Sequence, residues 1–155
     1  MDTFATDTPA GDTENAFSHL SPSLRAKLEA LSILSPTPVQ QRVIPRLASG
    51  ENLLFQSETG TGKTFAYLLP LIDAVEKKKS AAGGVKILIA APTVELSSQI
   101  RDAVRSITDI KCALFVGGAP LRRQAELLKE NPEIAVGNPA RLLELARLKK
   151  LKLAH

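Results

Sequence analysis

Short apolar segments that alternate with helical stretches limit the fold of this chain more than any other feature. The apolar segments lie at residues 52–55, 86–91, 111–116 and 133–136, and the helical stretches begin near Lys63, Glu95, Pro120 and Pro139. Strands and helices that alternate at this spacing are typical of βαβ units, in which the strands are parallel. The pattern therefore predicts an α/β protein with a parallel sheet.

Two helices are expected ahead of the first strand. The first follows Ser21 and Pro22 and carries an apolar stripe, and the second runs from Thr37 to Gly50. A hydroxyl residue followed by Pro favours a helix start, because the hydroxyl caps the first turn and Pro needs no N–H partner there. Pro45 lies inside the second helix and is expected to strain or kink it.

The first sixteen residues differ from the rest of the chain. They are rich in Thr, Asp and Gly and have almost nothing to bury, so residues 1–16 are predicted to be a disordered tail. The remaining residues, 17–155, are predicted to form one domain, which fits a chain of 155 residues. With 44% apolar and 23% charged residues, the chain as a whole is not a disordered polyampholyte.

The composition also limits where the chain acts. The longest apolar run, residues 85–92, contains Lys86 and is far shorter than the ~20 residues that span a bilayer. The first twenty residues contain no Lys or Arg, so they lack the basic start of a secretory signal. The lone cysteine, Cys112, has no partner for an internal disulfide, which fits a reducing compartment. We therefore expect a cytoplasmic protein without a membrane span.

The net charge of +4 is unevenly distributed along the chain. Residues 1–58 contain four basic and seven acidic side chains, whereas residues 59–155 contain sixteen and nine. The net charges are thus −3 and +7. The basic part suits contact with phosphate groups, but an ordinary solvated surface has the same count, so charge alone does not identify nucleic acid.

A glycine-rich loop, Ser57-Glu58-Thr59-Gly60-Thr61-Gly62-Lys63-Thr64, lies between an expected strand and an expected helix. This is the context of a phosphate-binding loop. Its glycines let successive N–H groups face one anion, Lys63 adds a positive charge near the β and γ phosphates, and Thr64 adds a hydroxyl for Mg²⁺. Ser57 stands where the usual pattern has Gly, so a plain glycine turn is the alternative. The loop indicates a nucleotide and no particular activity.

The residues around this loop resemble the N-terminal RecA-like domain of DEAD-box ATP-dependent RNA helicases. In that family the loop begins with Ala or Ser and ends in Gly-Lys-Thr, as residues 57–64 do. Residues 36–40 (PTPVQ) are similar to the family's Q motif, which implies that Gln40 reads the edge of adenine. By the same resemblance, Phe17 is the aromatic residue that stacks on the base. Ser32 and Ile33 depart from the family, which has Gly and an aromatic residue there.

Three segments further along resemble the RNA-binding motifs of the same family. Residues 92–97 (PTVELS) are similar to motif Ia, residues 117–118 to its double glycine, and residues 137–142 (GNPARL) to its Thr-Pro-Gly-Arg motif. The resemblance implies that these loops hold the RNA backbone without reading sequence. Val94 replaces a family Arg, so we expect about one phosphate contact fewer; Asn138 and Ala140 replace Thr and Gly. The candidate RNA-binding residues are Pro92, Thr93, Glu95, Gly117, Gly118, Asn138, Pro139 and Arg141.

The resemblance covers residues 17–155 and implies a RecA-like domain with helices on both faces of the sheet, incomplete at its C-terminus. The family's Asp-Glu-Ala-Asp motif is expected soon after Leu153, and the chain stops there. The parent is expected to use ATP and Mg²⁺, with Lys63 and Thr64 as catalytic residues, to unwind RNA or remodel RNA–protein complexes. This chain alone is expected to bind ATP without turnover. A catalytically inactive ATP- or RNA-binding module and an unrelated phosphate-loop kinase are the alternatives.

Overall fold

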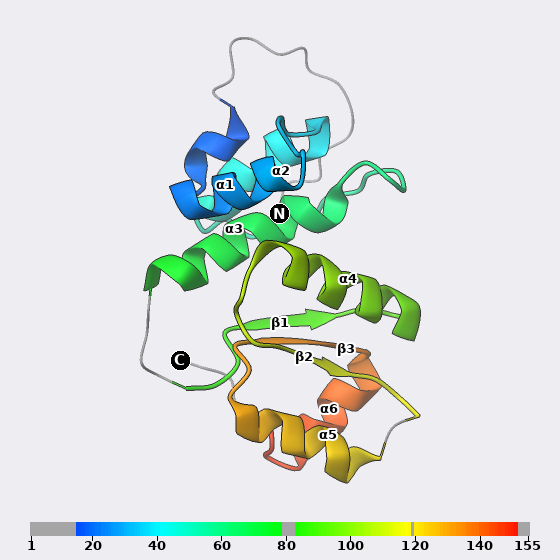
Figure 1. Cartoon of the computed structure of the whole chain (residues 1–155). Coiled ribbons are helices and arrows are strands. Elements are labelled where there is room, and N and C mark those ends of the chain that lie inside the picture. Colours follow the sequence, from blue (N-terminus) through cyan, green and yellow to red (C-terminus); the bar gives the residue numbers. More distant parts are fainter. Residues whose placement is uncertain (1–14, 79–82, 119, 152–155) are drawn as a thin grey trace. The chain divides into compact units, whose positions relative to one another are not determined.

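The computed structural model describes residues 15–78, 83–118 and 120–151, and these form two compact units (Figure 1). One unit ends at Lys78, and the other comprises the described residues from Gly83 on. Of the predicted tail, only Asn15 and Ala16 lie within the described residues. The side chain of Ala16 is fully buried, and its N–H donates to the side-chain oxygen of Gln41 over 3.0 Å. The folded part therefore begins earlier than the predicted boundary at residue 17.

The first unit is helical. Its elements are η1 (Ala16–His19), α1 (Pro22–Ala30), α2 (Pro38–Ala48) and α3 (Lys63–Lys78). The hydroxyls of Ser21 and Thr37 cap α1 and α2, each directly before a Pro, so both predicted helix starts are confirmed. The largest fully buried side chains of these helices are Leu24, Leu28, Ile44, Leu68, Leu69 and Ile72.

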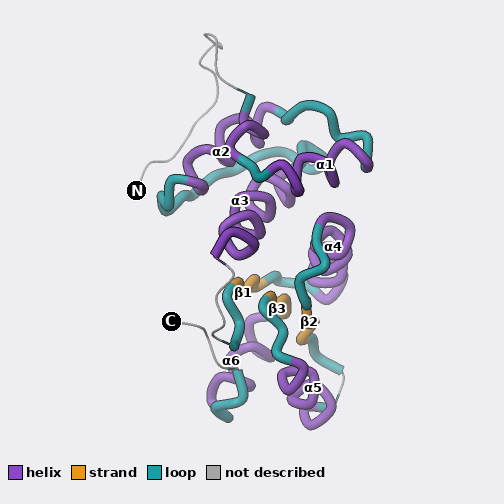
Figure 2. Tube along the Cα trace, turned by 60° about the vertical axis from the view of Figure 1, so that its left-hand side comes forward, coloured by secondary structure: helices purple, strands orange, loops and turns teal. Residues whose placement is uncertain are grey.

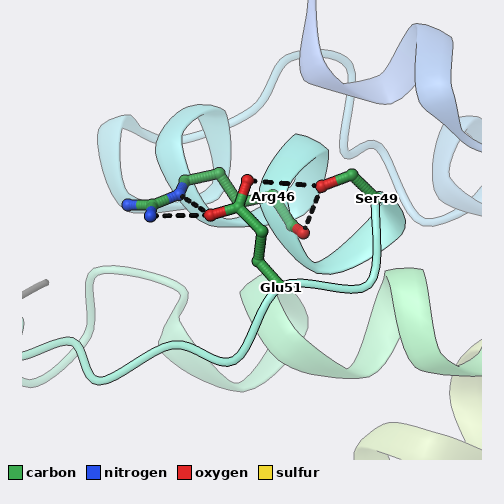
Figure 3. A network of polar contacts seen from close by, with 3 residues as sticks. All are labelled: Arg46, Ser49 and Glu51. Atoms are coloured by element: carbon green, nitrogen blue, oxygen red, sulfur yellow. Dashed lines mark hydrogen bonds and ion pairs between the residues drawn. The ribbon is translucent and has the colours of Figure 1, made fainter. Parts of the chain in front are cut away.

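Helix α2 continues through Pro45 and ends at Ala48, two residues before the predicted end at Gly50. Gly50 adopts a φ of +87°, and the N–H of Glu51 donates to the carbonyl oxygen of Arg46 over 3.0 Å. This is a Schellman arrangement, in which glycine relieves the strain of the left-handed conformation. Figure 3 shows how side chains tie the same turn together: Arg46 pairs with Glu51 at 2.7 Å, and Ser49 donates to both residues.

The second unit is a three-stranded parallel sheet in the order β1-β3-β2. Helix α4 covers one face, and α5 and α6 cover the other (Figures 1 and 2), so the predicted α/β architecture is confirmed within this unit. Phe115, Ala135, Leu142 and Leu145 form the centre of the core beneath α5 and α6. The elements are β1 (Ile87–Ala90), α4 (Val94–Ile107), β2 (Cys112–Phe115), α5 (Leu121–Leu127), η2 (Leu128–Glu130), β3 (Ile134–Gly137) and α6 (Pro139–Arg147).

The strand predicted at residues 52–55 is wrong. Only Leu54 takes part in an isolated bridge, and its side chain is 52% exposed. An apolar run becomes a strand only when neighbouring strands satisfy its N–H and C=O groups, and a local pattern does not supply those neighbours. The phosphate loop therefore follows a segment that is not a strand of the sheet.

Candidate nucleotide and nucleic-acid sites

Backbone turns set the shape of the phosphate loop. Gly60 and Gly62 adopt φ values of +83° and +90°, a left-handed region that side chains with a Cβ rarely enter. The Lys63 ammonium donates to the carbonyl oxygens of Ser57 and Glu58, so the lysine is folded back onto its own loop. The hydroxyl of Thr61 also donates to the carbonyl of Glu58, over 2.9 Å. In this conformation the Lys63 ammonium is hydrogen bonded to the backbone of its own loop.

Gln40 connects helix α2 to the phosphate loop. Its side chain is 2% exposed, and its amide Nε2 donates to the carbonyl oxygen of Gly62 over 3.1 Å. Its Oε1 accepts from the backbone N–H of Thr37 over 3.0 Å, while the Thr37 hydroxyl accepts from the N–H of Gln40. These two reciprocal bonds form a capping box. The residue predicted to read adenine is thus also the residue that holds the loop.

The fit between Gln40 and Gly62 leaves no room for a larger residue. A Cβ added at Gly62 would lie 2.5 Å from Nε2 of Gln40 and 3.2 Å from the hydroxyl oxygen of Thr37. At Gly60, whose φ is similar, a Cβ would meet nothing within 4 Å. Gly62 is therefore required by contact as well as by conformation, whereas Gly60 borders open space in which an anion has room.

Thr64, the predicted Mg²⁺ ligand, lies in the first turn of α3 and hydrogen bonds with the side chain of Tyr67. Burial raises the pKa of the Tyr67 hydroxyl, and the bond to Thr64 offsets part of that rise. The phenol is therefore neutral at pH 7 and able to orient the Thr64 hydroxyl. Among the described residues, no three His, Cys, Asp or Glu side chains gather where they could hold a metal ion.

Phe17, the predicted stacking residue, lies in η1 and is 6% exposed. Its ring lines a cavity of about 220 Å³ together with Leu28, Ile33 and Leu34. The residues that the structure places around that cavity include none of the loop residues 57–64. In this conformation Phe17 packs against its own unit, and its contact with a base stays a prediction.

The three candidate RNA-binding loops meet at one edge of the sheet. Ala90 in β1 and Phe115 in β2 both pair with Gly137 in β3, so the three parallel strands end level with one another. The N–H of Ala91 donates to Gly137 over 2.9 Å, and the N–H of Asn138 donates to Phe115 over 3.1 Å. The loops that leave this carboxyl edge, residues 91–93, 116–118 and 138, are therefore neighbours. Such edges are where open α/β sheets bind ligands.

Two polar side chains at the carboxyl edge accept hydrogen bonds in helix caps. Thr93 and Asn138 accept from the N–H groups of Leu96 and Arg141, over 3.1 and 3.0 Å. Thr93 still has its hydroxyl hydrogen to donate. Arg141 pairs with Glu144 at 3.5 Å, and its side chain is only 14% exposed, so it is not a freely solvated cation.

The other candidates at this edge differ in what surrounds them. Pro92 and Glu95 are exposed, and Pro139 is the first residue of α6. A Cβ at Gly117 or Gly118 would meet nothing within 4 Å, so the glycine loop borders open space. Gly118 adopts a φ of +87°, which explains why glycine occupies it.

A family model described as DEAD/DEAH box helicase matches residues 37–154. This stretch includes Gln40, the whole phosphate loop and all three loops of the carboxyl edge. The chain belongs to the DEAD/DEAH box helicase family. The alternative of an unrelated phosphate-loop kinase is therefore not favoured.

Individual family members confirm the match. The chain is 39% identical over 137 residues to the DEAD-box ATP-dependent RNA helicase CshC of Bacillus cereus, covering 86% of this chain and 34% of that protein. It is 34% identical over 142 residues to CshB of Bacillus subtilis, covering 88% of this chain and 32% of that protein. The chain thus spans about a third of the length of these DEAD-box relatives.

Solved structures of the family have the same fold. A DEAD-box protein from Methanococcus jannaschii is 32% identical, with a TM-score of 0.78 over 86% of this chain and 36% of that chain. Mss116p, solved with single-stranded RNA and AMP-PNP, is 26% identical, with a TM-score of 0.82 over 95% of this chain and 32% of that chain. The RecA-like fold predicted from the DEAD-box resemblance is confirmed.

Three residues of this DEAD-box chain were not predicted to shape the sites. Thr37 caps Gln40, and the Thr-x-x-Gln spacing of a capping box would have identified the pair. Gly137 is needed because a Cβ there would lie 2.1 Å from the carbonyl oxygen of Phe115. Gln124 holds the backbone of the glycine loop through Val116, and no local pattern marks it.

Cys112, the lone cysteine, is half-buried at the start of β2. Burial raises the pKa of its thiol to about 11, against a smaller lowering by the nearby Arg105 and Arg101. A neutral thiol is a poor nucleophile, so Cys112 is not activated for nucleophilic chemistry. Within the described residues, no helix is long and apolar enough to cross a bilayer.

Proposed function

We propose that this chain is the ATP-binding part of an ATP-dependent RNA helicase that couples ATP binding and hydrolysis to RNA unwinding or to remodelling of RNA–protein complexes. The observation that carries the proposal is the bond from the Gln40 amide to the Gly62 carbonyl, at 3.1 Å. It joins the adenine-reading residue to the loop that binds phosphate, so base and phosphates can be recognised by one connected element. The curated relatives, each named an ATP-dependent RNA helicase, support this over an inactive binding module.

The phosphate loop has to open when it binds a nucleotide. Lys63 leaves the carbonyls of Ser57 and Glu58 and pairs with phosphate oxygens, a charge-assisted contact stronger than the bonds it gives up. The backbone N–H groups of Thr59, Gly60 and Thr61, and the start of α3, face the same anion. Thr64 would hold Mg²⁺ through its hydroxyl, and that ion, when bound, neutralises charge on the β and γ phosphates.

The carboxyl edge is proposed to hold the RNA backbone. Its donors are the N–H groups of Gly117 and Gly118, the Thr93 hydroxyl and the first N–H of α6, that of Ala140 next to Pro139, none of which distinguishes one base from another. Binding is therefore expected to be weak, sensitive to salt and indifferent to sequence. Mss116p, solved with single-stranded RNA and AMP-PNP, supports the assignment of both ligands. A cytoplasmic site of action, which the lone reduced cysteine favours, belongs to the same proposal.

We expect this chain to bind nucleotide without appreciable hydrolysis. Phosphoryl transfer to water needs an acid that holds Mg²⁺ and a cation on the transition state. Among the described residues, no carboxylate directly follows a strand of the sheet, since these positions hold Ala91, Val116 and Asn138. Phosphate release should therefore equal that of Lys63→Ala, with or without RNA. RNA-stimulated release that this substitution abolishes would contradict the expectation.

Displacement of a bound fluorescent adenine nucleotide by ATP or by GTP tests the nucleotide assignment. ATP should compete better than GTP, because the oxygen of guanine at position 6 presents the wrong partner to Gln40. Lys63→Ala should weaken both by roughly tenfold to a hundredfold, the weight of a charge-assisted bond. Lys78→Ala, at the far end of α3, is the matched control and should change neither. Equal affinities for ATP and GTP would remove Gln40 as the reader of the base.

A further inference from the structure

Gln124 is a buried polar residue with an unusual set of contacts. It lies in α5, is 4% exposed, and its Nε2 donates to the carbonyl oxygen of Val116 over 2.6 Å. Its Oε1 is fully buried, and no residue in the described part of the chain hydrogen bonds to it. The amide is therefore half satisfied, with its one bond directed at the residue before Gly117.

Stability does not account for an amide at this position. The buried Oε1 has no partner and costs at least as much free energy as the one neutral hydrogen bond to Val116 contributes, so the amide brings no net stability. A residue that breaks the rule of polar satisfaction is expected at sites under functional constraint. The one bond that Gln124 makes is then the feature to explain.

That bond sets the direction of a backbone N–H group. The carbonyl of Val116 and the N–H of Gly117 belong to one planar trans peptide unit and point in opposite directions. By holding the carbonyl on the side of α5, Gln124 turns the N–H of Gly117 away from that helix. Gly117 and Gly118 have no side chains that could fix this plane, and both border open space.

We propose that Gln124 is a positioning residue for RNA, which through the Val116 carbonyl holds the N–H of Gly117 toward a backbone phosphate. Without the bond, the peptide unit before two glycines is free to rotate, and binding has to order it. The proposal rests on the RNA-binding function proposed above. It adds a residue that does not touch RNA itself.

Gln124→Met tests the proposal, because it keeps the length of the side chain and removes the amide. Anisotropy of labelled single-stranded oligo(U) should show binding weaker by about threefold to tenfold, the effect of one hydrogen bond. The melting temperature should change little, because the unpaired acceptor of Gln124 is gone while the carbonyl of Val116 loses its donor. Gln99→Met, an exposed residue of α4, is the control and should change neither quantity. Unchanged RNA affinity in Gln124→Met would overturn the proposal.

Gln124→Glu provides a second test that a purely structural role would not pass. A protonated carboxyl can donate to the Val116 carbonyl as the amide does, whereas a carboxylate cannot. Burial raises the pKa of a carboxyl, so the carboxyl of the Gln124→Glu variant should lose its proton as the pH rises from about 5 to about 8. Over that range the RNA affinity of Gln124→Glu should decrease relative to that of wild type. A ratio of variant to wild-type RNA affinity that does not change with pH contradicts the proposal, and so does unfolding of both variants.

The same titrations separate failure of this proposal from failure of the proposed function. If wild type binds no RNA, the proposed function fails as well. If wild type and both variants bind RNA equally, only the role of Gln124 fails.

Discussion

The phosphate loop and the carboxyl edge of the sheet use their donor groups in opposite ways. In the phosphate loop, the Lys63 ammonium and the Gln40 amide are bound to carbonyl oxygens of the chain itself. At the carboxyl edge, Gly117 and Gly118 border open space on a loop that β2 and α5 hold in place. One site is closed by internal bonds, and the other is open.

This difference predicts that the two ligands bind at different free-energy costs. A nucleotide must displace internal hydrogen bonds before it gains its own, so part of its binding free energy goes into rearranging the loop. A nucleic-acid backbone meets donors whose directions are already fixed by the strand ends and by the bond from Gln124 in α5 to Val116. We therefore expect substitutions in the loop to have larger effects than substitutions at the edge, because loop residues control both conformation and contact.

Gly62→Ala is expected to have the largest effect. The new Cβ would lie 2.5 Å from Nε2 of Gln40, and alanine would have to adopt a φ of +90°. Clash and conformational strain together should abolish measurable nucleotide binding, with the strain alone worth about 1–2 kcal/mol. Titration with a fluorescent adenine nucleotide measures the loss.

Gly60→Ala isolates the contribution of the Gln40 contact. Its φ of +83° imposes nearly the same strain, but its Cβ would meet nothing within 4 Å. Nucleotide affinity should therefore fall less than in Gly62→Ala. Equal losses in the two variants would show that conformation alone matters and that the contact between Gln40 and Gly62 does not hold the loop.

Val94→Arg should strengthen RNA binding at the carboxyl edge. Val94 is 41% exposed in the first turn of α4, beside Thr93. One added phosphate contact should raise affinity by roughly threefold to tenfold and steepen the salt dependence by about 0.7 in the log–log slope. Leu148→Arg adds the same charge at the far end of α6 and should do much less. Equal gains from both would mean that net charge, and not the carboxyl edge, attracts RNA.

One glycine substitution in each unit should relieve backbone strain and raise stability slightly without changing ligand binding. Ser32 and Lys149 follow the ends of α1 and α6 with φ values of +60° and +54°, where glycine is favoured. Ser32→Gly and Lys149→Gly should each raise the free energy of unfolding by about 0.5–1 kcal/mol in urea titrations. Ser49→Gly, at a φ of −79°, should not. Nucleotide and RNA affinities should stay unchanged in all three variants.

Helix starts could be predicted from the sequence because their signals are local. Ser21 and Thr37 each cap a helix directly before a Pro, and Gly50 ends α2. The three strands of the sheet were also predicted, within a residue or two. The strand at residues 52–55 was not formed, because a strand depends on partners that lie elsewhere in the chain.

In the two sites, too, features that depend on contiguous residues could be predicted, whereas contacts between residues far apart in the sequence could not. The glycines and Lys63 of the phosphate loop follow from a contiguous pattern. The closing of that loop by Gln40 depends on a contact between residues 22 positions apart. The bond from Gln124 to Val116 likewise joins a helix to a loop, and neither partner carries a signal of its own.

The central claim is that nucleotide and RNA bind to separate sets of residues, one in each unit. Lys63→Ala and Gly118→Val, each titrated separately with a fluorescent adenine nucleotide and with labelled single-stranded RNA, test it most directly. Lys63→Ala should weaken nucleotide binding by roughly tenfold to a hundredfold and keep RNA binding, whereas Gly118→Val should weaken RNA binding and keep nucleotide binding. A variant that loses both ligands while still folded, or wild type that binds neither, would contradict the account.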